Sequence, residues 1–243
     1  MKIVLVIPAR YRSSRFPGKP LTDIAGKAML LRVYEQCIKA FPREAVYVAT
    51  EDVRIVDYCT TQNIQSILTS DDCLTGTDRV AEAAETLGAD VYINVQGDEP
   101  VFNPDDIKLL LEKVNEKPDQ VYCGYSEIDN EAMYVSRSTP KMVMGLNGQL
   151  LYMSRSAIPG NKAGSFSFAY RQVCAYAFPK EALKIYKACT AKTPLEQEED
   201  LELLRFIEMG YPVQLVKMSA ESIPVDHPED VIKVLERLNH DSN

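Results

Sequence analysis

Three cations in one short segment are the residues of this chain best suited to chemistry. Arg10, Arg15 and Lys19 lie in segment 8–20, among three prolines and a glycine. The prolines and the glycine exclude a long helix, so the cations must project from a shaped loop. Arginine forks and a lysine point charge match the oxygens of a phosphate chain. The segment predicts a loop that holds a nucleoside triphosphate; a solvated basic loop is the alternative.

Two familiar phosphate-binding patterns are absent from this segment. It contains neither G-x-x-x-x-G-K-[ST], the P-loop pattern, nor G-x-G-x-x-G, which is typical of dinucleotide-binding turns. A P-loop NTPase is therefore not indicated, and a dinucleotide site is disfavoured.

Two aspartates lie where carboxylates could hold a metal. Asp98 follows an apolar run in segment 94–100, and Asp226 lies in segment 223–230. Mg²⁺ prefers carboxylate oxygens together with substrate phosphates. If the two segments end side by side, both carboxylates could share one Mg²⁺ that faces the α-phosphate. The structural alternatives are a plain turn at Gly97 and Asp98, and a helix N-cap at Asp226.

A further polar set lies between a strand-like run and a helix-like run. Ser70 and Thr77 carry small hydroxyl groups that could contact a base or a substrate. Asp78 and Arg79 better fit helix capping and ion pairing.

Composition narrows the ligand class. The 243 residues carry a net charge of −8, with a pI near 5.0, which argues against a broad nucleic-acid surface. Local cations in an acidic chain favour a small anionic ligand. No apolar run approaches the roughly 20 residues of a membrane span, and too few residues precede Pro8 for a signal sequence. A cytoplasmic protein without a membrane partner is expected.

Cysteine and histidine usage excludes other kinds of site. Six cysteines are scattered without any C-x-x-C pair, and there are only two histidines. Free, mostly buried thiols are expected, while a zinc site or a histidine-dependent hydrolase triad is poorly supported.

Alternating elements position these residues up to about residue 118. Apolar runs predict strands at 2–7, 45–50, 66–68 and 91–95, and amphipathic patterns predict helices at 28–40, 52–62, 77–87 and 104–115. This alternation indicates a parallel sheet with helices on both faces, which binds ligands at the carboxyl ends of its strands.

The alternation of predicted strands and helices ends after Lys117. Strands are predicted at 121–128, 141–144, 150–153 and 168–178, so we expect an inserted β-rich lobe at approximately 119–178 within a single domain of residues 1–243. Helices are then predicted at 180–188, 195–208 and 228–238, with a strand at 212–218 and another that ends at Asp226.

Taken together, these motifs resemble the sugar-activating cytidylyltransferases, most closely the 3-deoxy-manno-octulosonate (Kdo) cytidylyltransferase family. The resemblance spans nearly the whole chain. It rests on the segments 7–20, 75–79, 94–100, 154–159, 194–205 and 225–230.

The resemblance implies a mostly parallel, Rossmann-like α/β nucleotidyltransferase sheet flanked by helices, with the smaller lobe making a homodimer contact and helping to bind the acceptor. It implies Mg²⁺ as cofactor, CTP as donor and a small acidic sugar as acceptor. The acceptor's anomeric hydroxyl would attack the α-phosphorus of CTP, giving a CMP-sugar and pyrophosphate.

The same resemblance assigns roles to individual residues. It makes Asp98 and Asp226 the metal ligands, and these act in catalysis with Arg10 and Lys19. It implies nucleotide contacts at Pro8, Arg10, Arg15, Lys19, Ser70, Arg79 and Gln96. It implies acceptor contacts at Arg155, Gln172, Tyr176, Glu202 and Leu203.

Two positions depart from the family pattern. Gln172 stands where the family has a histidine that approaches the sugar acid, and Leu203 stands where a sugar-contacting glutamine is expected. A site that loses a hydrogen-bonding group changes its discrimination between substrates. The acceptor is therefore Kdo, with the two changes compensating each other, or another small anion such as a modified ulosonic acid, a sialic-type acid or a phosphonate.

Two other functions remain open. A nucleotidyltransferase for a sugar phosphate would use UTP or GTP, and only the resemblance selects CTP. A non-catalytic nucleotide-binding module is the second alternative, and the joint presence of Lys19, Asp98 and Asp226 argues against it.

Overall fold

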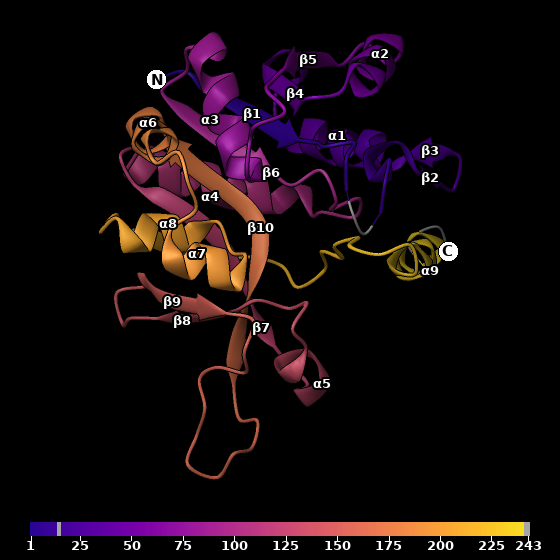
Figure 1. Cartoon of the computed structure of the whole chain (residues 1–243). Helices are drawn as coiled ribbons and strands as arrows, with labels where there is room; N and C mark the ends of the chain where they lie inside the picture. Colours follow the sequence, from indigo (N-terminus) through magenta and orange to yellow (C-terminus); the bar gives the residue numbers. More distant parts are fainter. Residues whose placement is uncertain (14–15, 241–243) are drawn as a thin grey trace.

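A single large sheet forms the centre of the computed structural model, which describes residues 1–13 and 16–240 (Figure 1). Its strands lie in the order β11-β7-β10-β6-β1-β4-β5, with β8 and β9 attached beside β10. The strands of this sheet are β1 (Ile3–Pro8), β4 (Val46–Thr50), β5 (Gln65–Leu68), β6 (Val91–Val95), β7 (Val121–Ile128), β8 (Lys141–Met144), β9 (Leu150–Ser154), β10 (Ala169–Pro179) and β11 (Val213–Lys217). A small hairpin consists of β2 (Asp23–Ile24) and β3 (Lys27–Ala28).

Helices cover both faces of the sheet (Figure 1). The described helices are α1 (Met29–Ala40), α2 (Val53–Thr61), α3 (Gly76–Leu87), α4 (Pro104–Glu116), α5 (Glu131–Val135), α6 (Lys180–Ala188), α7 (Pro194–Glu199), α8 (Leu203–Glu208) and α9 (Asp230–His240), with short 3₁₀ turns at Lys19–Leu21 and Arg43–Ala45. Of these, α5 lies at the outer end of β7 and α9 packs against β2 (Figure 1). None of these described helices is long and apolar enough to cross a bilayer.

The strand directions confirm the predicted fold class. β1 is parallel to both β4 and β6, and β5 and β11 are parallel to their neighbours β4 and β7. β10 alone on the main path runs antiparallel, between β6 and β7. The sheet is therefore mixed but mostly parallel. Its central strands β1 and β6 are apolar and buried, as expected for strands that are covered on both faces.

Two apolar cores hold the helices against the sheet. On one face, Leu5 packs in the same cluster as Val33 of α1 and Leu110 of α4. On the other face, Val6 packs in a cluster that includes Val80 of α3 and residues of α6 and α8. Successive side chains of β1 point to opposite faces of the sheet, so β1 contributes to both cores.

The predicted helix at 195–208 was wrong, because α7 and α8 are separate helices. Asp200 ends α7 with a left-handed backbone, φ 52°. Arg155 donates to the carbonyl oxygens of Glu199 at 2.7 Å and Asp200 at 3.1 Å, and Lys192 pairs with the Asp200 carboxylate. The hydrogen bonds from Arg155 satisfy carbonyl groups at the end of α7, so the helix can stop there.

The predicted strand ending at Asp226 was also wrong. Residues 218–229 form no helix or strand, and α9 begins only at Asp230. The Asp230 carboxylate accepts hydrogen bonds from the amides of Asp226 and His227.

The region 119–178 shares its long strands with the main sheet. β7 and β10 extend beyond the body of the molecule, and their outer ends carry α5, the β8–β9 hairpin and the loop 155–168 (Figure 1). This projecting part, here called the lobe, is therefore continuous with the sheet and has no sheet of its own. The short helix α5 was not predicted.

A buried cation lies inside the lobe. Lys141 of β8 has no exposed surface, and its ammonium donates to the carbonyl oxygens of Ser136 at 2.7 Å and Arg155 at 2.6 Å. Burial, together with the nearby charge of Arg155, lowers the pKa of Lys141 to about 8. The two carbonyl groups solvate the ammonium only in part.

We expect Lys141 to make a larger contribution to the stability of the protein as the pH rises. Between pH 8 and the ordinary lysine pKa of 10.5, the unfolded chain binds a proton that the folded chain has lost. The difference in unfolding free energy between wild type and Lys141→Met should therefore shift toward wild type by about 3 kcal/mol over this interval. Urea denaturation of both proteins from pH 7 to 10.5 measures it, and a difference independent of pH would contradict the lowered pKa.

Candidate active site

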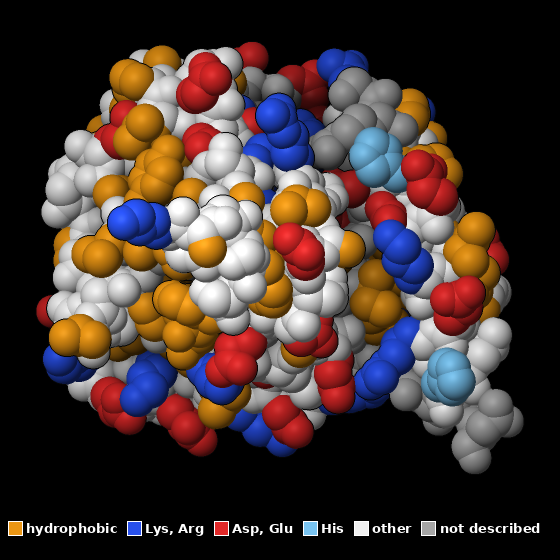
Figure 2. All heavy atoms as spheres, turned by 90° about the horizontal axis from the view of Figure 1, so that it is seen from below, with side chains coloured by type: hydrophobic (Ala, Val, Ile, Leu, Met, Phe, Trp, Pro, Cys, Tyr) orange, Lys and Arg blue, Asp and Glu red, His pale blue; other side chains and the backbone are white. Residues whose placement is uncertain are grey.

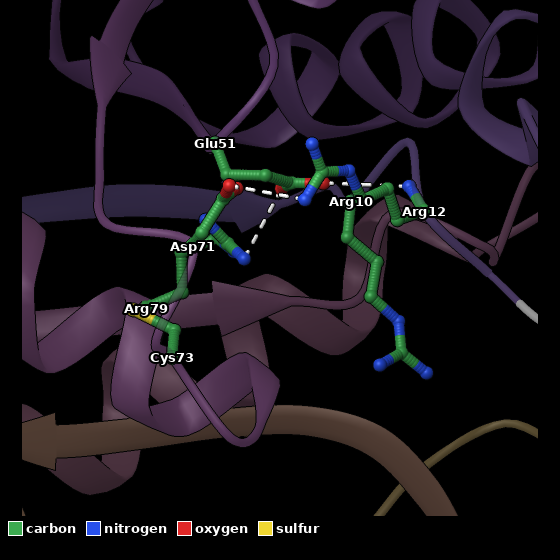
Figure 3. Close-up of a pocket in the computed structure, with 6 residues that line it drawn as sticks. All are labelled: Arg10, Arg12, Glu51, Asp71, Cys73 and Arg79. Atoms are coloured by element: carbon green, nitrogen blue, oxygen red, sulfur yellow. Dashed lines mark hydrogen bonds and ion pairs between the residues drawn. The ribbon is translucent and has the colours of Figure 1, made fainter.

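The loops that follow β1, β4 and β5 meet the start of α3 around one pocket (Figure 3). This is the edge at which the parallel strands end, as the sequence predicted. The pocket is lined by Arg10, Arg12, Glu51, Asp71, Cys73 and Arg79. Arg12 and Arg79 pair with the two acids of this lining, so its net positive charge, which suits an anion, comes from Arg10.

A buried ion pair forms the base of the pocket. Arg79 Nη2 lies 3.1 Å from Glu51 Oε2, and each side chain is only 5% exposed. The same guanidinium donates to Thr69 Oγ1 at 2.5 Å, while Glu51 Oε1 accepts the Tyr11 amide at 2.9 Å. One pair therefore connects α3 with the ends of β1, β4 and β5. The pairing expected of Arg79 is confirmed, and its contact with a nucleotide stays a prediction.

The loop after β1 is shaped by local contacts around Tyr11. Gly18 has a φ of +72°, which favours glycine, and its amide donates to the Tyr11 carbonyl at 2.9 Å. The Arg54 guanidinium covers the Tyr11 ring at 3.4 Å from the centroid. Arg10 is exposed and points away from the Glu51 and Arg79 pair (Figure 3). The loop thus presents the Arg10 guanidinium toward solvent, where a ligand can reach it.

Two members of the predicted triphosphate loop, Ser14 and Arg15, lie outside the described residues. Arg15 therefore stays a predicted nucleotide contact.

Lys19 and Asp98 meet next to the segment that carries Asp226. Lys19 Nζ donates to Asp98 Oδ2 at 2.8 Å and to the Val225 carbonyl at 2.7 Å. The Val225 amide in turn donates to the Asp98 carbonyl at 2.9 Å. Asp226 follows directly, so these contacts bring both predicted metal ligands into one corner. The sequence anticipated this meeting, although no strand carries Asp226.

A close approach of two backbones makes this corner compact. A Cβ at Gly97 would lie 2.7 Å from the carbonyl oxygen of Pro8, the last residue of β1. Only glycine lets the loop after β6 approach β1 so closely. Pro8 contributes here by its backbone, and its predicted contact with a nucleotide is untested.

The donor set in this corner fits a divalent metal. The described residues include no cluster of three acidic, histidine or cysteine side chains that could bind a metal alone. Two aspartates are instead the number that Mg²⁺ commonly takes from a protein when phosphates and water supply the rest. The Lys19 ammonium at 2.8 Å also shows that the Asp98 carboxylate is placed to receive a cation.

Gln96 and Glu202 contact each other beside the start of α3. Gln96 Nε2 donates to Glu202 Oε1 at 3.1 Å, and the Thr77 amide donates to Glu202 Oε2 at 2.9 Å. Burial raises the pKa of Glu202, and the hydrogen bond from Thr77 opposes that rise. Both residues were predicted to bind ligands, and the structure places them together between α3 and α8. Ser70 lies beside Arg79, which donates to its carbonyl at 3.4 Å, and the Ser70 amide donates to Glu82 at 2.7 Å.

A second ion network fastens α8 to α3. Arg205 has no exposed surface and lies 2.7 Å from both Asp78 and Glu196. Its guanidinium also lies over the Tyr186 ring, 3.9 Å from the centroid. Asp78 was expected to cap or pair, and it does pair.

The remaining predicted acceptor contacts occupy three places. Gln172 donates to the Tyr176 hydroxyl at 2.9 Å, and the two residues lie four positions apart on β10, on either side of its bulge. Arg155 donates to backbone carbonyls of Arg137, Glu199 and Asp200, as described for α7. Leu203 has no exposed surface and packs in the apolar core. An acceptor contact at Leu203 would require a rearrangement and stays a prediction, as do those at the other positions.

Sequence reasoning missed two acidic residues of this region, Glu51 and Glu99. Glu51 follows the buried strand β4, and Glu99 follows the buried strand β6. An acidic residue just after a buried apolar run is the sequence signal that could have identified them. Glu99 is 2% exposed and accepts a hydrogen bond from the Ser222 hydroxyl. Burial, then the charge of Asp98, raises the pKa of Glu99 to about 7.

Comparison with known proteins gives one consistent family. The family model described as "Cytidylyltransferase" matches residues 4–220. The 3-deoxy-manno-octulosonate cytidylyltransferase of Protochlamydia amoebophila is 39% identical over 245 residues, covering 98% of this chain and 94% of the relative. The Escherichia coli protein of the same name is 36% identical over 233 residues, covering 96% and 94%.

Solved structures agree with the sequence comparison. A CMP:2-keto-3-deoxy-manno-octonic acid synthetase complexed with CTP is 36% identical, with a TM-score of 0.91, and the match covers 99% of this chain and 100% of that one. HddC from Yersinia pseudotuberculosis, at 16% identity and a TM-score of 0.70, shares the fold.

We expect Glu51→Ala to destabilise the protein by about 3–5 kcal/mol, because it leaves the buried Arg79 without a counter-charge. Urea denaturation measures this change. The matched control is Asp71→Ala, which removes the exposed partner of Arg12 and should cost less than about 1 kcal/mol. Equal effects of the two substitutions would contradict the role given to the buried pair.

Proposed function

Because this chain belongs to the 3-deoxy-manno-octulosonate cytidylyltransferase family and is a nucleotidyltransferase, we propose that it transfers CMP from CTP to a 2-keto sugar acid, with release of pyrophosphate. The observation that carries this proposal is the meeting of Lys19, Asp98 and the Asp226 segment beside a cationic pocket. That arrangement provides charge for a triphosphate and carboxylates for a metal at the same strand ends.

The reaction forms one bond and breaks one. The acceptor's anomeric hydroxyl attacks the α-phosphorus of CTP, the bond to the bridging oxygen breaks, and pyrophosphate leaves while the hydroxyl proton passes to solvent. Arg10 and Lys19 supply positive charge where the leaving group gains negative charge. Asp98 and Asp226 would hold Mg²⁺, which supplies Lewis acidity at the α-phosphate and lowers the pKa of the attacking hydroxyl.

The acceptor is proposed to be Kdo or a Kdo-like acid. The support for this acceptor is that the similar proteins of Protochlamydia amoebophila and Escherichia coli are 3-deoxy-manno-octulosonate cytidylyltransferases. Leu203 stands where a sugar-contacting glutamine is expected, so the alternative acceptors are a modified ulosonic acid, a sialic-type acid or a phosphonate.

We also propose a homodimer formed through the lobe. Leu146, Leu151 and Phe168 are large apolar side chains of the lobe with exposures of 112%, 55% and 57%. Seen from below, hydrophobic side chains gather over much of one half of the surface (Figure 2). A second copy of the chain would cover such a surface. The cytoplasmic location expected from the sequence remains a prediction.

Pyrophosphate release tests the donor and the acceptor together. We expect release with CTP, Mg²⁺ and Kdo, at least about tenfold slower release with ATP, GTP or UTP, and none with EDTA. A panel of 8-amino-Kdo, sialic acids and phosphonates then ranks the acceptors. No release with CTP and any acceptor would contradict the proposed reaction, and preference for UTP or GTP with a sugar phosphate would replace it.

Asp98→Asn should lower turnover about 100-fold or more, because it removes a metal-binding charge and the partner of Lys19. The protein should remain folded by circular dichroism, since Asp98 is partly exposed. Asp105→Asn, which changes an exposed acid on α4, is the matched control and should keep normal turnover. Near-normal turnover of Asp98→Asn would remove this carboxylate from the mechanism.

A further inference from the structure

One irregular segment delivers Asp226 to the site. Residues 218–226, here called the strap, connect β11 to α9 without helix or strand (Figure 1). Their place depends on contacts with other elements, because the strap has no regular backbone pairing of its own.

Two side chains hold the first part of the strap. Asp106 of α4 accepts the Ser219 amide at 2.9 Å and its hydroxyl at 2.7 Å. Arg171 of β10 donates to the Ala220 carbonyl at 2.9 Å. These anchors lie six or more residues before Asp226, so they leave the end of the strap undetermined.

The end of the strap is held from the turn after β6. Ser222 donates its hydroxyl to the Glu99 carboxylate, and Val225 bonds to Asp98 and Lys19 as described above. Val225 is also fully buried, in the cluster that joins α9 to the hairpin. Two successive residues, Asp98 and Glu99, therefore contact two points of the strap on the approach to Asp226.

The burial of Glu99 is unusual for a carboxyl group outside an ion pair. Its side chain is 2% exposed, and it accepts a hydrogen bond from the hydroxyl of Ser222, which is 4% exposed. A buried polar group costs free energy unless it is bonded, so the two side chains stabilise each other's positions. The contact joins residues 123 positions apart in the sequence.

We propose that Glu99 is a positioning residue that, through Ser222, holds the end of the strap and thereby sets Asp226 beside Asp98. The catalytic meaning of this geometry rests on the proposed function, whereas the geometry itself does not. Glu99 need not touch either substrate to act in this way.

Amide hydrogen exchange and Mn²⁺ binding test the geometry without turnover. Glu99→Ala and Ser222→Ala should each raise exchange at residues 222–227 at least about tenfold and weaken Mn²⁺ binding to the nucleotide-free protein. Glu99→Gln keeps an oxygen that accepts the Ser222 hydroxyl, so it should exchange like wild type. Ser219→Ala, which removes an anchor at the far end of the strap, should leave 222–227 and Mn²⁺ binding unchanged.

Kinetics then separate positioning from general loosening. Glu99→Ala should lower kcat about tenfold or more and raise the Mg²⁺ concentration required, with little change in the KM for CTP. The double variant Glu99→Ala with Ser222→Ala should be no worse than Glu99→Ala alone, because both act through one contact.

Unchanged exchange at 222–227 in both Glu99→Ala and Ser222→Ala would overturn the proposal, as would an equal rise in Ser219→Ala. If Glu99→Ala does not fold, Ser222→Ala and Glu99→Gln decide the same question from the other partner. Absence of turnover in wild type would overturn the proposed function, while the exchange and Mn²⁺ results would still decide the role of Glu99.

Discussion

The buried ion pair between Arg79 and Glu51 is the constraint on which the rest of the site depends. The loops after β1, β4 and β5 have no sheet partners beyond the ends of their strands, and this pair is where they are tied together. An unpaired charge at either position would be buried without compensation. The two residues therefore act as a unit, and the direction in which Arg10 projects follows from where that unit holds the amide of Tyr11.

Much of the fold could be predicted because burial leaves a local pattern. The apolar runs of β1 and β6 predicted strands, and the amphipathic pattern at 104–115 predicted α4. The break at Asp200 could not be predicted, since it depends on Arg155, which is 45 residues away in the sequence. The antiparallel place of β10 between β6 and β7 likewise depends on long-range pairing that no local period records.

Some contacts of the candidate site could likewise be predicted from the sequence, and others could not. Lys19 and Asp98 could be expected to meet, because parallel strands β1 and β6 end at one edge of the sheet. The resemblance to the cytidylyltransferases, which supplied the reaction, is confirmed by the full-length relatives. The engagement of Arg155 with backbone carbonyls and the burial of Leu203 could not be read from residue types, because each depends on its tertiary neighbours.

The double hydrogen bond of Lys19 has a consequence for how a polyanion enters. A chain with a net charge of −8 repels a triphosphate at long range, and two aspartates at the destination would add to that repulsion. The ammonium on Asp98 cancels one of these charges before any ligand arrives. An incoming nucleotide therefore meets one net negative charge at this corner where the two aspartates alone would present two, and the exposed Arg10 guanidinium offsets the charge that remains.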